Sequence, residues 1–371
     1  MIPFRFHHLY TLLDTMFSSP IGESNRVAAY FKEHPALGSK DRQWINARIF
    51  TILRHRRLLE TLILKEGKEL SAQTLVDKVE EGVTENLELF PHLPWAIRYS
   101  ISDDLADCLS QDYGEDEAIR LAKLFLEEAP CSIRVNTRRI SVDKLQEILP
   151  FPCQRGAAPS SLRFERRYPL QHTRAFRRGL FEIQDESSQI ITNAILIKDS
   201  DTVLDFCAGA GGKSLIFAQR ARHVTLHDSR PQALEEARTR LSRSGIKNFT
   251  IASSPLKKQG FSLVVVDAPC TGSGVFRRHP EKKWLFSKKL LKDNALAQEK
   301  ILKQAQAYVA PRGRLVYITC SLLKEENEKH TSYMEALGWK CIKEVKIPLV
   351  SQQGDAFFFY TFYPNTRSLE P

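Results

Sequence analysis

Two cysteines and one aspartate stand at the points where predicted strands end. The apolar stretch "FSLVVVDAPCTGSG" (261–274) predicts a buried strand that ends at Asp267, followed by a glycine-containing loop that carries Cys270. The stretch "GRLVYITCS" (313–321) predicts another buried strand, which ends just before Cys320. If these strands are neighbours in a parallel sheet, their carboxyl ends share one edge and the three side chains should face one cleft. The alternative is that each cysteine is only a small hydrophobic packing residue.

Two thiols and a carboxyl group suit methylation at carbon 5 of cytosine. Carbon 5 is too weak a nucleophile to take a methyl group directly, but a thiolate that adds to carbon 6 makes it enamine-like. A carboxyl group at N3 can share a proton with the ring, and a base then removes the carbon-5 proton before the thiol is eliminated. A free thiol of pKa ~8.5 is mostly protonated at neutral pH. We expect Lys213 and Arg277 to lower that pKa. Because a base in a helix must first be unstacked, RNA loops are the favoured substrates.

The stretch "VLDFCAGAGGKSLIFAQ" (203–219) predicts a strand, a turn of small residues and a helix, an arrangement that often binds a ligand. A P-loop would need glycine where Cys207 stands, and a dinucleotide fingerprint would need glycine at Ser214. S-adenosylmethionine fits better. Small residues at 208–212 allow the backbone to approach its methionine part, and a helix that begins near Gly212 can receive its carboxylate.

The next predicted strand ends in "VTLHD", which places Asp228 at the carboxyl edge of the sheet. An acidic group at this position can accept hydrogen bonds from both hydroxyls of a ribose. The alternative role is that of a helix cap before Pro231.

Hydrophobic periodicity divides the chain into three parts. Residues 1–80 and 94–127 have apolar residues at helical spacing, and "CSIRVNT" (131–137) has strand-like alternation. From residue 201 onward strands and helices alternate, which predicts a parallel sheet with helices on both faces. The expected strands are 202–207, 223–228, 248–252, 261–267 and 313–319, and the expected helices are 212–222, 231–244, 286–309 and 324–336. Two last strands, 340–347 and 356–363, should be partly antiparallel.

The composition is that of a soluble globular protein, with 371 residues, 42% hydrophobic and 26% charged. No apolar run approaches the ~20 residues of a membrane span, and the N-terminus does not resemble a signal peptide. Seven cysteines without a CxxC pair argue against a zinc site and disulfides, and favour the cytoplasm. The net charge of +10 favours a nucleic-acid partner. Basic residues are concentrated in three stretches, "RVNTRR" (134–139), "RFERRYPLQHTRAFRR" (163–178) and "FRRHPEKKW" (276–284). Aromatic residues are interleaved with the basic ones in the second and third stretches. The alternative is that these are solvated loops.

Three motifs carry a resemblance to a known family. In order, "DFCAGAGGKS", "DAPCTGSGVFRRHPEKKW" and "TCSLLKEEN" resemble the motifs of RNA (cytosine-5) methyltransferases of the Sun/RsmB type. The segments "SIRVNT", "GLFEIQDESSQ" and "DAFFFYTFY" extend the resemblance over about 131–363. Upstream, "ALGSKDRQWINARIFTILRHRRLLETLI" resembles the NusB-like helical domain of the group that methylates bacterial 16S ribosomal RNA, the closest in layout.

The resemblance implies roles for individual residues. It implies that Cys320 is the nucleophile and that Cys270 assists elimination, although the reverse arrangement of DNA cytosine-5 methyltransferases stays open. Asp267 matches the position that contacts base and cofactor, and Lys213 also points toward the active site. The positions implied to bind S-adenosylmethionine are Cys207, Ala208, Gly209, Ala210, Gly211, Gly212, Lys213, Asp228, Ser254 and Asp267. The predicted RNA contacts are Arg134, Arg277, Arg278 and His279, and no metal is expected.

The chain departs from the family pattern at four places. Ala210 replaces a proline, so we expect a looser turn, and Ser254 replaces the acid that meets adenine, so we expect weaker cofactor binding. Ala233 replaces an arginine, and the helical N-terminal domain is shorter than a full NusB-like fold.

Together these observations predict an α/β protein. We expect a helical NusB-like domain (1–82), an RNA-binding subdomain of helices and an RRM-like α+β part (83–185), and a class I methyltransferase domain with a seven-stranded Rossmann-like sheet (186–371). The predicted function is formation of 5-methylcytosine in RNA by a cytoplasmic monomer, with ribosomal RNA favoured over transfer RNA. The alternatives are a transfer RNA methyltransferase, an RNA-binding ribosome-assembly factor with weak catalysis, and a P-loop NTPase.

Overall fold

The computed structural model describes residues 3–17, 25–252, 256 and 260–365. The chain divides into two compact units, one formed by residues 1–128 with 276–288 and the other by 129–275 with 289–371. Both boundaries differ from the expected ones. The boundary expected at residue 82 falls inside the first unit, and the segment 83–185 is divided between the two units.

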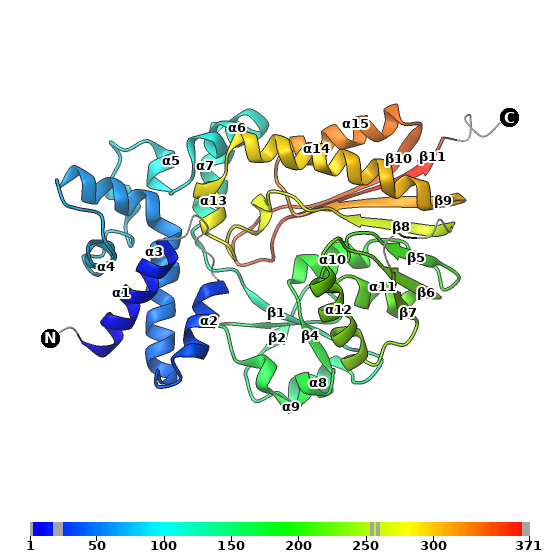
Figure 1. Cartoon of the computed structure of the whole chain (residues 1–371), viewed down its shortest axis with the longest axis horizontal. Coiled ribbons are helices and arrows are strands. Elements are labelled where there is room, and N and C mark those ends of the chain that lie inside the picture. The colour runs from blue at the N-terminus through cyan, green and yellow to red at the C-terminus, as the bar shows by residue number, and fades with distance from the viewer. Residues whose placement is uncertain (1–2, 18–24, 253–255, 257–259, 366–371) are drawn as a thin grey trace. The chain divides into compact units, whose positions relative to one another are not determined.

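The first unit is all helical (Figure 1). Its longest helix, α3, buries Ile45, Ile49 and Ile52, whose spacing of three and four residues forms one apolar stripe. The helices are α1 (Phe4–Phe17), α2 (Asn25–Glu33), α3 (Ser39–Lys65), α4 (Ala72–Glu80), α5 (Trp95–Arg98), α6 (Asp103–Tyr113), α7 (Glu115–Leu124) and α13 (Glu281–Leu285).

Helix α13 joins this unit although it follows the predicted catalytic loop in sequence. Lys283 is fully buried there and donates hydrogen bonds to the carbonyls of Arg54 (2.5 Å) and Tyr99 (3.0 Å). Burial and the nearby Arg54 guanidinium hold the pKa of Lys283 well below its usual value. Trp284 donates from Nε1 to the carbonyl of Leu53 at 3.1 Å. These bonds tie the basic segment after the catalytic loop to α3 and α5.

The second unit contains two sheets. The small one is antiparallel, in the order β2-β3-β1-β4. It is formed by β1 (Cys131–Val135), β2 (Gln154–Arg155), β3 (Ser161–Phe164) and β4 (Phe181–Ile183), with α8 (Val142–Ile148) and α9 (Arg174–Arg177).

The large sheet has the order β10-β11-β9-β8-β5-β6-β7, and its parallel part runs from β9 to β7. Strand β8 is central and nearly continuously apolar because helices cover both faces of a doubly wound sheet. The strands are β5 (Thr202–Asp205), β6 (His223–Leu226), β7 (Phe249–Ile251), β8 (Phe261–Asp267), β9 (Val309–Thr319), β10 (Trp339–Ile347) and β11 (Phe357–Pro364). The helices are α10 (Glu186–Asn193), α11 (Ser214–Arg220), α12 (Pro231–Arg243), α14 (Lys288–Ala305) and α15 (Glu328–Ala336). The predicted parallel sheet and its two antiparallel strands, β10 and β11, are confirmed.

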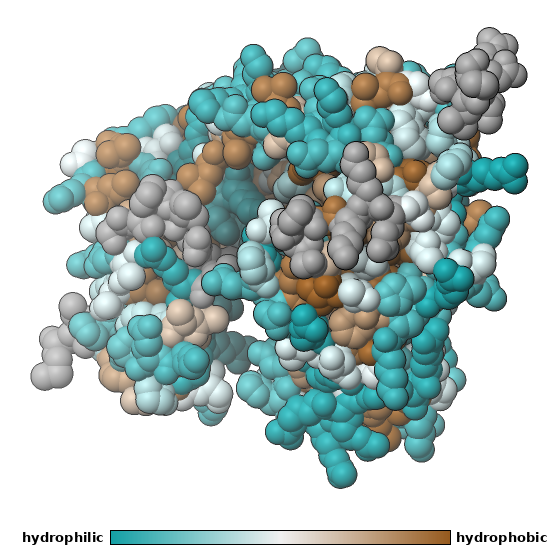
Figure 2. Space-filling model, turned by 45° about the vertical axis from the view of Figure 1, so that its right-hand side comes forward, coloured by the Kyte–Doolittle hydropathy of each residue, from teal (hydrophilic) through white to brown (hydrophobic). Residues whose placement is uncertain are grey.

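Among the described residues, no helix is long and apolar enough to cross a membrane. The face of the molecule in Figure 2 is mostly hydrophilic, and hydrophobic residues lie on it in separate groups.

A buried ion pair between Asp201 and Arg314 lies at the start of β5. Asp201 accepts hydrogen bonds from Arg314 Nη2 (2.6 Å), Ser262 Oγ (2.8 Å) and the backbone N–H of Lys198 (2.7 Å). Burial raises the pKa of Asp201, but these bonds outweigh burial and hold the pKa below its usual value. The folded state therefore stabilises the carboxylate, and this contribution is lost as the pH falls through the folded-state pKa.

We expect Asp201→Asn to lower the free energy of unfolding by about 3 kcal/mol at pH 7, because it leaves the buried Arg314 without its anionic partner. The difference should begin to shrink as the pH falls below about 4 and should be lost once the pH is below the lower folded-state pKa, where the wild-type carboxyl is protonated too. Urea unfolding followed by circular dichroism measures it, with the exposed Asp199→Asn as control. Equal losses for the two variants at pH 7 would contradict the assignment.

Candidate active site

The two predicted cysteines meet at the carboxyl ends of β8 and β9. These strands are parallel neighbours, and the sulfur atoms of Cys270 and Cys320 lie 3.4 Å apart. The backbone N–H of Gly274 donates to the carbonyl of Cys320 at 2.8 Å, which fixes the loop after β8 against the end of β9. A Cβ on Gly274 would lie 2.8 Å from this carbonyl oxygen, so no larger residue fits. The structure thus places both thiols in one site.

Asp267 and Lys213 connect this site to the glycine-rich turn. Lys213 Nζ donates to Asp267 Oδ2 at 2.6 Å. Burial lowers the pKa of Lys213, but the negative charges of Asp267 and the Cys320 thiolate outweigh burial and raise it above its usual value. The lysine is therefore a cation at neutral pH.

The expectation that basic neighbours lower the thiol pKa is wrong for Cys270. Its hydrogen bond with Cys320 and its burial raise the pKa of Cys270 well above its usual value, and the Glu326 carboxylate acts in the same direction. Arg277 belongs to the helical unit, where its guanidinium pairs with Glu127 at 3.6 Å. Cys270 therefore keeps its proton at neutral pH.

The glycine-rich turn has the backbone shape that its small residues allow. Gly209 and Gly211 have positive φ angles of 52° and 74°. A Cβ on Gly211 would lie 2.9 Å from the Cβ of Ala237, and 3.0 Å from Leu241 Cδ1 on α12. Glycine at 211 is thus required both by conformation and by close packing against α12.

Asp228 is fixed beside this turn at the end of β6. Its carboxylate accepts hydrogen bonds from the backbone N–H groups of Gly209 (2.8 Å) and Arg230 (2.9 Å), and from the Arg230 side chain. Burial raises the pKa of Asp228, but these bonds outweigh it and lower the pKa below its usual value. The alternative role of Asp228 as a helix cap is not what the structure shows. The carboxylate bonds to Arg230, the N-cap residue of α12, and not to the first turn of that helix. Asp228 is therefore an ionised acceptor at the turn, and its contact with ribose stays a prediction.

Asp205 is a site residue that the sequence reasoning missed. It ends β5 directly before the turn and accepts a hydrogen bond from Ser214 Oγ at 2.5 Å. Its other oxygen, Oδ1, is buried without a hydrogen-bond partner among the described residues, and burial raises the pKa of Asp205 to about 7. The signal that identified Asp228 and Asp267, an acid at a strand end, applies to Asp205 as well.

A buried polar network that the sequence reasoning also missed supports the loop of Cys270. Glu326 accepts hydrogen bonds from the backbone N–H (2.9 Å) and Oγ1 (2.5 Å) of Thr271. Gln298 on α14 donates to Glu326 (3.0 Å) and to the carbonyl of Pro269 (2.9 Å). The residues on both sides of Cys270 are therefore held by side chains from α14 and from the segment after β9.

Two predicted RNA contacts are buried, which corrects the expectation that they lie on a surface. Arg134 donates to Gln184 Oε1 at 2.8 Å, and burial lowers the pKa of Arg134 to about 10. Arg277 is fully buried, whereas Arg278 and His279 are partly exposed. Ser254 lies outside the described residues. No three His, Cys, Asp or Glu side chains in the described part of the chain are grouped as a metal site requires.

The chain is similar to known methyltransferases. The family described as 16S rRNA methyltransferase RsmB/F matches residues 193–368. The ribosomal RNA small subunit methyltransferase B of Citrobacter koseri is 31% identical over 216 residues, which are 55% of this chain and 50% of that protein. A methyltransferase homolog protein from Pyrococcus horikoshii is 27% identical with a TM-score of 0.63, over 73% of this chain and 97% of that chain. The solved structure of PH0851 shares the fold, with a TM-score of 0.80 and 19% identity over 98% of this chain and 99% of that chain.

The doubly wound sheet, with its glycine-rich turn and strand-end acids, is that of a class I methyltransferase domain, and the predictions of this fold and of S-adenosylmethionine as cofactor are confirmed. Within that class, residues 193–368 match the family described as 16S rRNA methyltransferase RsmB/F, the family type that the motifs of this chain resemble. The chain spans about half the length of the curated relatives it matches.

Proposed function

We propose that the protein methylates carbon 5 of cytosine in RNA, with ribosomal RNA as the substrate. The observation that carries this proposal is the pair of thiols 3.4 Å apart beside the Lys213–Asp267 ion pair. An N-methyltransferase or O-methyltransferase needs no thiol, because its target atom is already nucleophilic. Carbon 5 of cytosine needs one, because it becomes nucleophilic only after a thiolate adds to carbon 6.

The residues around the turn fit S-adenosylmethionine. The small residues 208–212 suit its methionine chain, and Asp228 suits its ribose. When bound, the cofactor supplies an electrophilic methyl group.

The electrostatics favour Cys320 as the nucleophile. Lys213 interacts electrostatically with Cys320, whereas the hydrogen bond with Cys320 and burial raise the pKa of Cys270. Since only the thiolate attacks, Cys320 is the better nucleophile of the two. Cys270 lies beside the same sulfur, so its thiol can protonate the Cys320 thiolate that leaves carbon 6, and the Cys270 thiolate formed in this way can take the proton from carbon 5.

The Asp267 carboxyl group can bind the target cytosine. One of its oxygens is bonded to Lys213, and its side chain is about a third exposed, with a fractional exposure of 32%. A carboxyl group that is partly accessible and held beside a cation can bond to N3 of cytosine as charge develops on the ring.

Basic side chains of the small sheet support an RNA substrate. Arg166, Arg167, Arg174 and Arg177 are exposed, as the interpretation of 163–178 as a nucleic-acid surface requires. The matched relatives include a protein named for small-subunit ribosomal RNA, which favours that RNA over transfer RNA.

The test is a methyl-transfer assay on the full chain. Unmodified small-subunit ribosomal RNA and a pool of transfer RNA transcripts are incubated separately with methyl-labelled S-adenosylmethionine and digested to nucleosides. We expect label in 5-methylcytidine, at least tenfold more from ribosomal RNA. The reverse ratio would identify a transfer RNA enzyme. Cofactor binding without transfer to either RNA would favour the assembly-factor function.

A further inference from the structure

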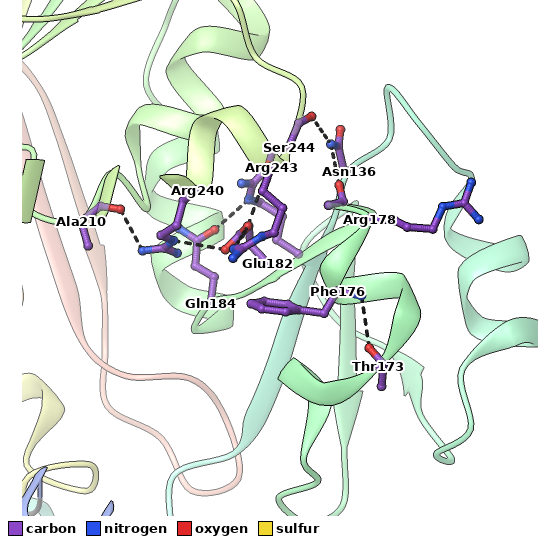
Figure 3. Close-up of polar contacts among 12 residues, drawn as sticks. Asn136, Thr173, Phe176, Arg178, Glu182, Gln184, Ala210, Arg240, Arg243 and Ser244 are labelled. Atoms are coloured by element: carbon purple, nitrogen blue, oxygen red, sulfur yellow. Dashed lines mark hydrogen bonds and ion pairs between the residues drawn. The ribbon is translucent and has the colours of Figure 1, made fainter. Parts of the chain in front are cut away.

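The middle of the cofactor-binding turn is held by a side chain from another element. Arg240 on α12 donates from Nη1 to the carbonyl of Ala210 at 3.0 Å (Figure 3). Ala210 stands where the family has proline, and a looser turn was expected there. The structure shows instead that a guanidinium restrains this peptide.

Arg240 is itself held in a fixed orientation. Its Nε donates to Glu182 Oε2 at 3.2 Å, and Glu182 Oε1 pairs with Arg243 at 2.5 Å. Glu182 lies on β4 of the small sheet and its side chain is only 4% exposed. The Arg243 guanidinium also lies over the ring of Phe176, 4.1 Å from its centroid (Figure 3). Because both Glu182 oxygens are occupied, the two arginines have defined directions.

The contact between α12 and the small sheet does not depend on Arg240. Asn136 Nδ2 donates to the carbonyls of Gly179 and Ser244, both at 2.9 Å, and Arg243 makes its own pair with Glu182 (Figure 3). These bonds already fasten the end of α12 to the small sheet. Arg240 adds a hydrogen bond to the turn. No other side chain in the described part of the chain donates to the Ala210 carbonyl.

We propose that Arg240 is a positioning residue for the cofactor, oriented by Glu182. It holds the Ala210 carbonyl and so keeps the turn in its binding shape before the cofactor arrives, which reduces the ordering cost of binding. The Gly211 contact with Ala237 fixes the turn against the same helix at a neighbouring point. This inference rests on the proposed function only in that S-adenosylmethionine binds at the turn.

The test compares Arg240→Gln with Arg238→Gln in the full chain. Arg238 is on the same helix but half exposed, and among the described residues it pairs with Glu235. We expect Arg240→Gln to weaken S-adenosylmethionine binding about tenfold by calorimetry, and to speed amide hydrogen exchange of residues 207–213 without cofactor. Turnover at saturating cofactor should change less than twofold, because Cys320 and Asp267 are untouched. Arg238→Gln should change none of these.

A second substitution separates positioning from general stability. Ala210→Pro restrains φ of the same residue by a different means, so in the Arg240→Gln background it should restore most of the affinity, and in the wild-type background it should add little. Equal affinities for the Arg240→Gln and Arg238→Gln variants, or a loss that Ala210→Pro does not repair, would overturn the proposal. Amide exchange is measured without RNA or methyl transfer, so it decides this inference even if the RNA assay contradicts the proposed function.

Discussion

Cys320→Ala is expected to abolish both methyl transfer and covalent attachment to RNA, whereas Cys270→Ala should accumulate protein attached to RNA. The reason is the division of roles between sulfur atoms only 3.4 Å apart. Without the Cys320 thiolate nothing adds to carbon 6, so transfer should fall by at least about 10⁴-fold, as when other enzymes lose a nucleophile. Without Cys270 the addition and methylation proceed, but elimination is slow, so the adduct persists on a denaturing gel.

The control for this pair is Cys341→Ala, which removes a cysteine on the edge strand β10. It should behave as wild type, because no catalytic contact is assigned to that thiol. An adduct in Cys320→Ala and none in Cys270→Ala would exchange the two roles. Absence of adduct and of methyl transfer in all proteins, with cofactor binding intact, would point to the assembly-factor alternative.

The grouping of the candidate site residues could be predicted because it follows from strand ends. Apolar runs that terminate in Asp267 or just before Cys320 locate these residues at one sheet edge, whatever the rest of the fold does. The glycine-rich turn could be predicted for a similar reason, since the positive φ of Gly209 and Gly211 is a local requirement.

Contacts between distant segments could not be predicted in this way. The bond from Arg240 to Ala210 joins residues 30 positions apart, and the ion pair with Glu182 joins residues 58 apart. Helical periodicity identifies Arg240 as a position on α12 but does not specify its partners. The burial of Arg134 could not be predicted for the same reason. Alternation in β1 predicts a strand, but it does not show which face of the small sheet packs against Gln184 and α11.

The domain boundaries were only partly accessible from the sequence. The change from helical to strand-like periodicity between residues 127 and 131 coincides with the boundary at residue 128, but the segment 276–288 has the composition of a basic loop that continues the motif of Cys270. Its assignment to the helical unit depends on the buried Lys283 and on Trp284, whose partners are carbonyls of α3 and α5 or their flanks. Every residue carries a backbone carbonyl group, so the sequence does not show to which of them a lysine will donate its hydrogen bonds.

Asp267→Asn is expected to reduce the single-turnover rate by about 10²- to 10³-fold, the range seen when one preorganised electrostatic contact is removed from an active site. The side chain keeps its size, but an amide cannot hold the proton shared with N3 of cytosine. It also removes the charge that faces Lys213 Nζ at 2.6 Å. Because burial alone lowers the pKa of Lys213, the loss of Asp267 should lower the pKa of this lysine and so weaken the positive charge beside the thiols.

Two further variants test this account of Asp267. If Lys213 and Asp267 act as one unit, Lys213→Gln combined with Asp267→Asn should be no slower than the slower single variant. Asp228→Asn, a change in another strand-end acid of the same sheet, should weaken cofactor binding but leave the rate at saturating cofactor within about threefold. A rate for Asp267→Asn that is also within about threefold of wild type would exclude the carboxyl group from the methyl-transfer step. The contrast is informative because both acids lie at the carboxyl edge, and only Asp267 is bonded to the lysine beside the thiols.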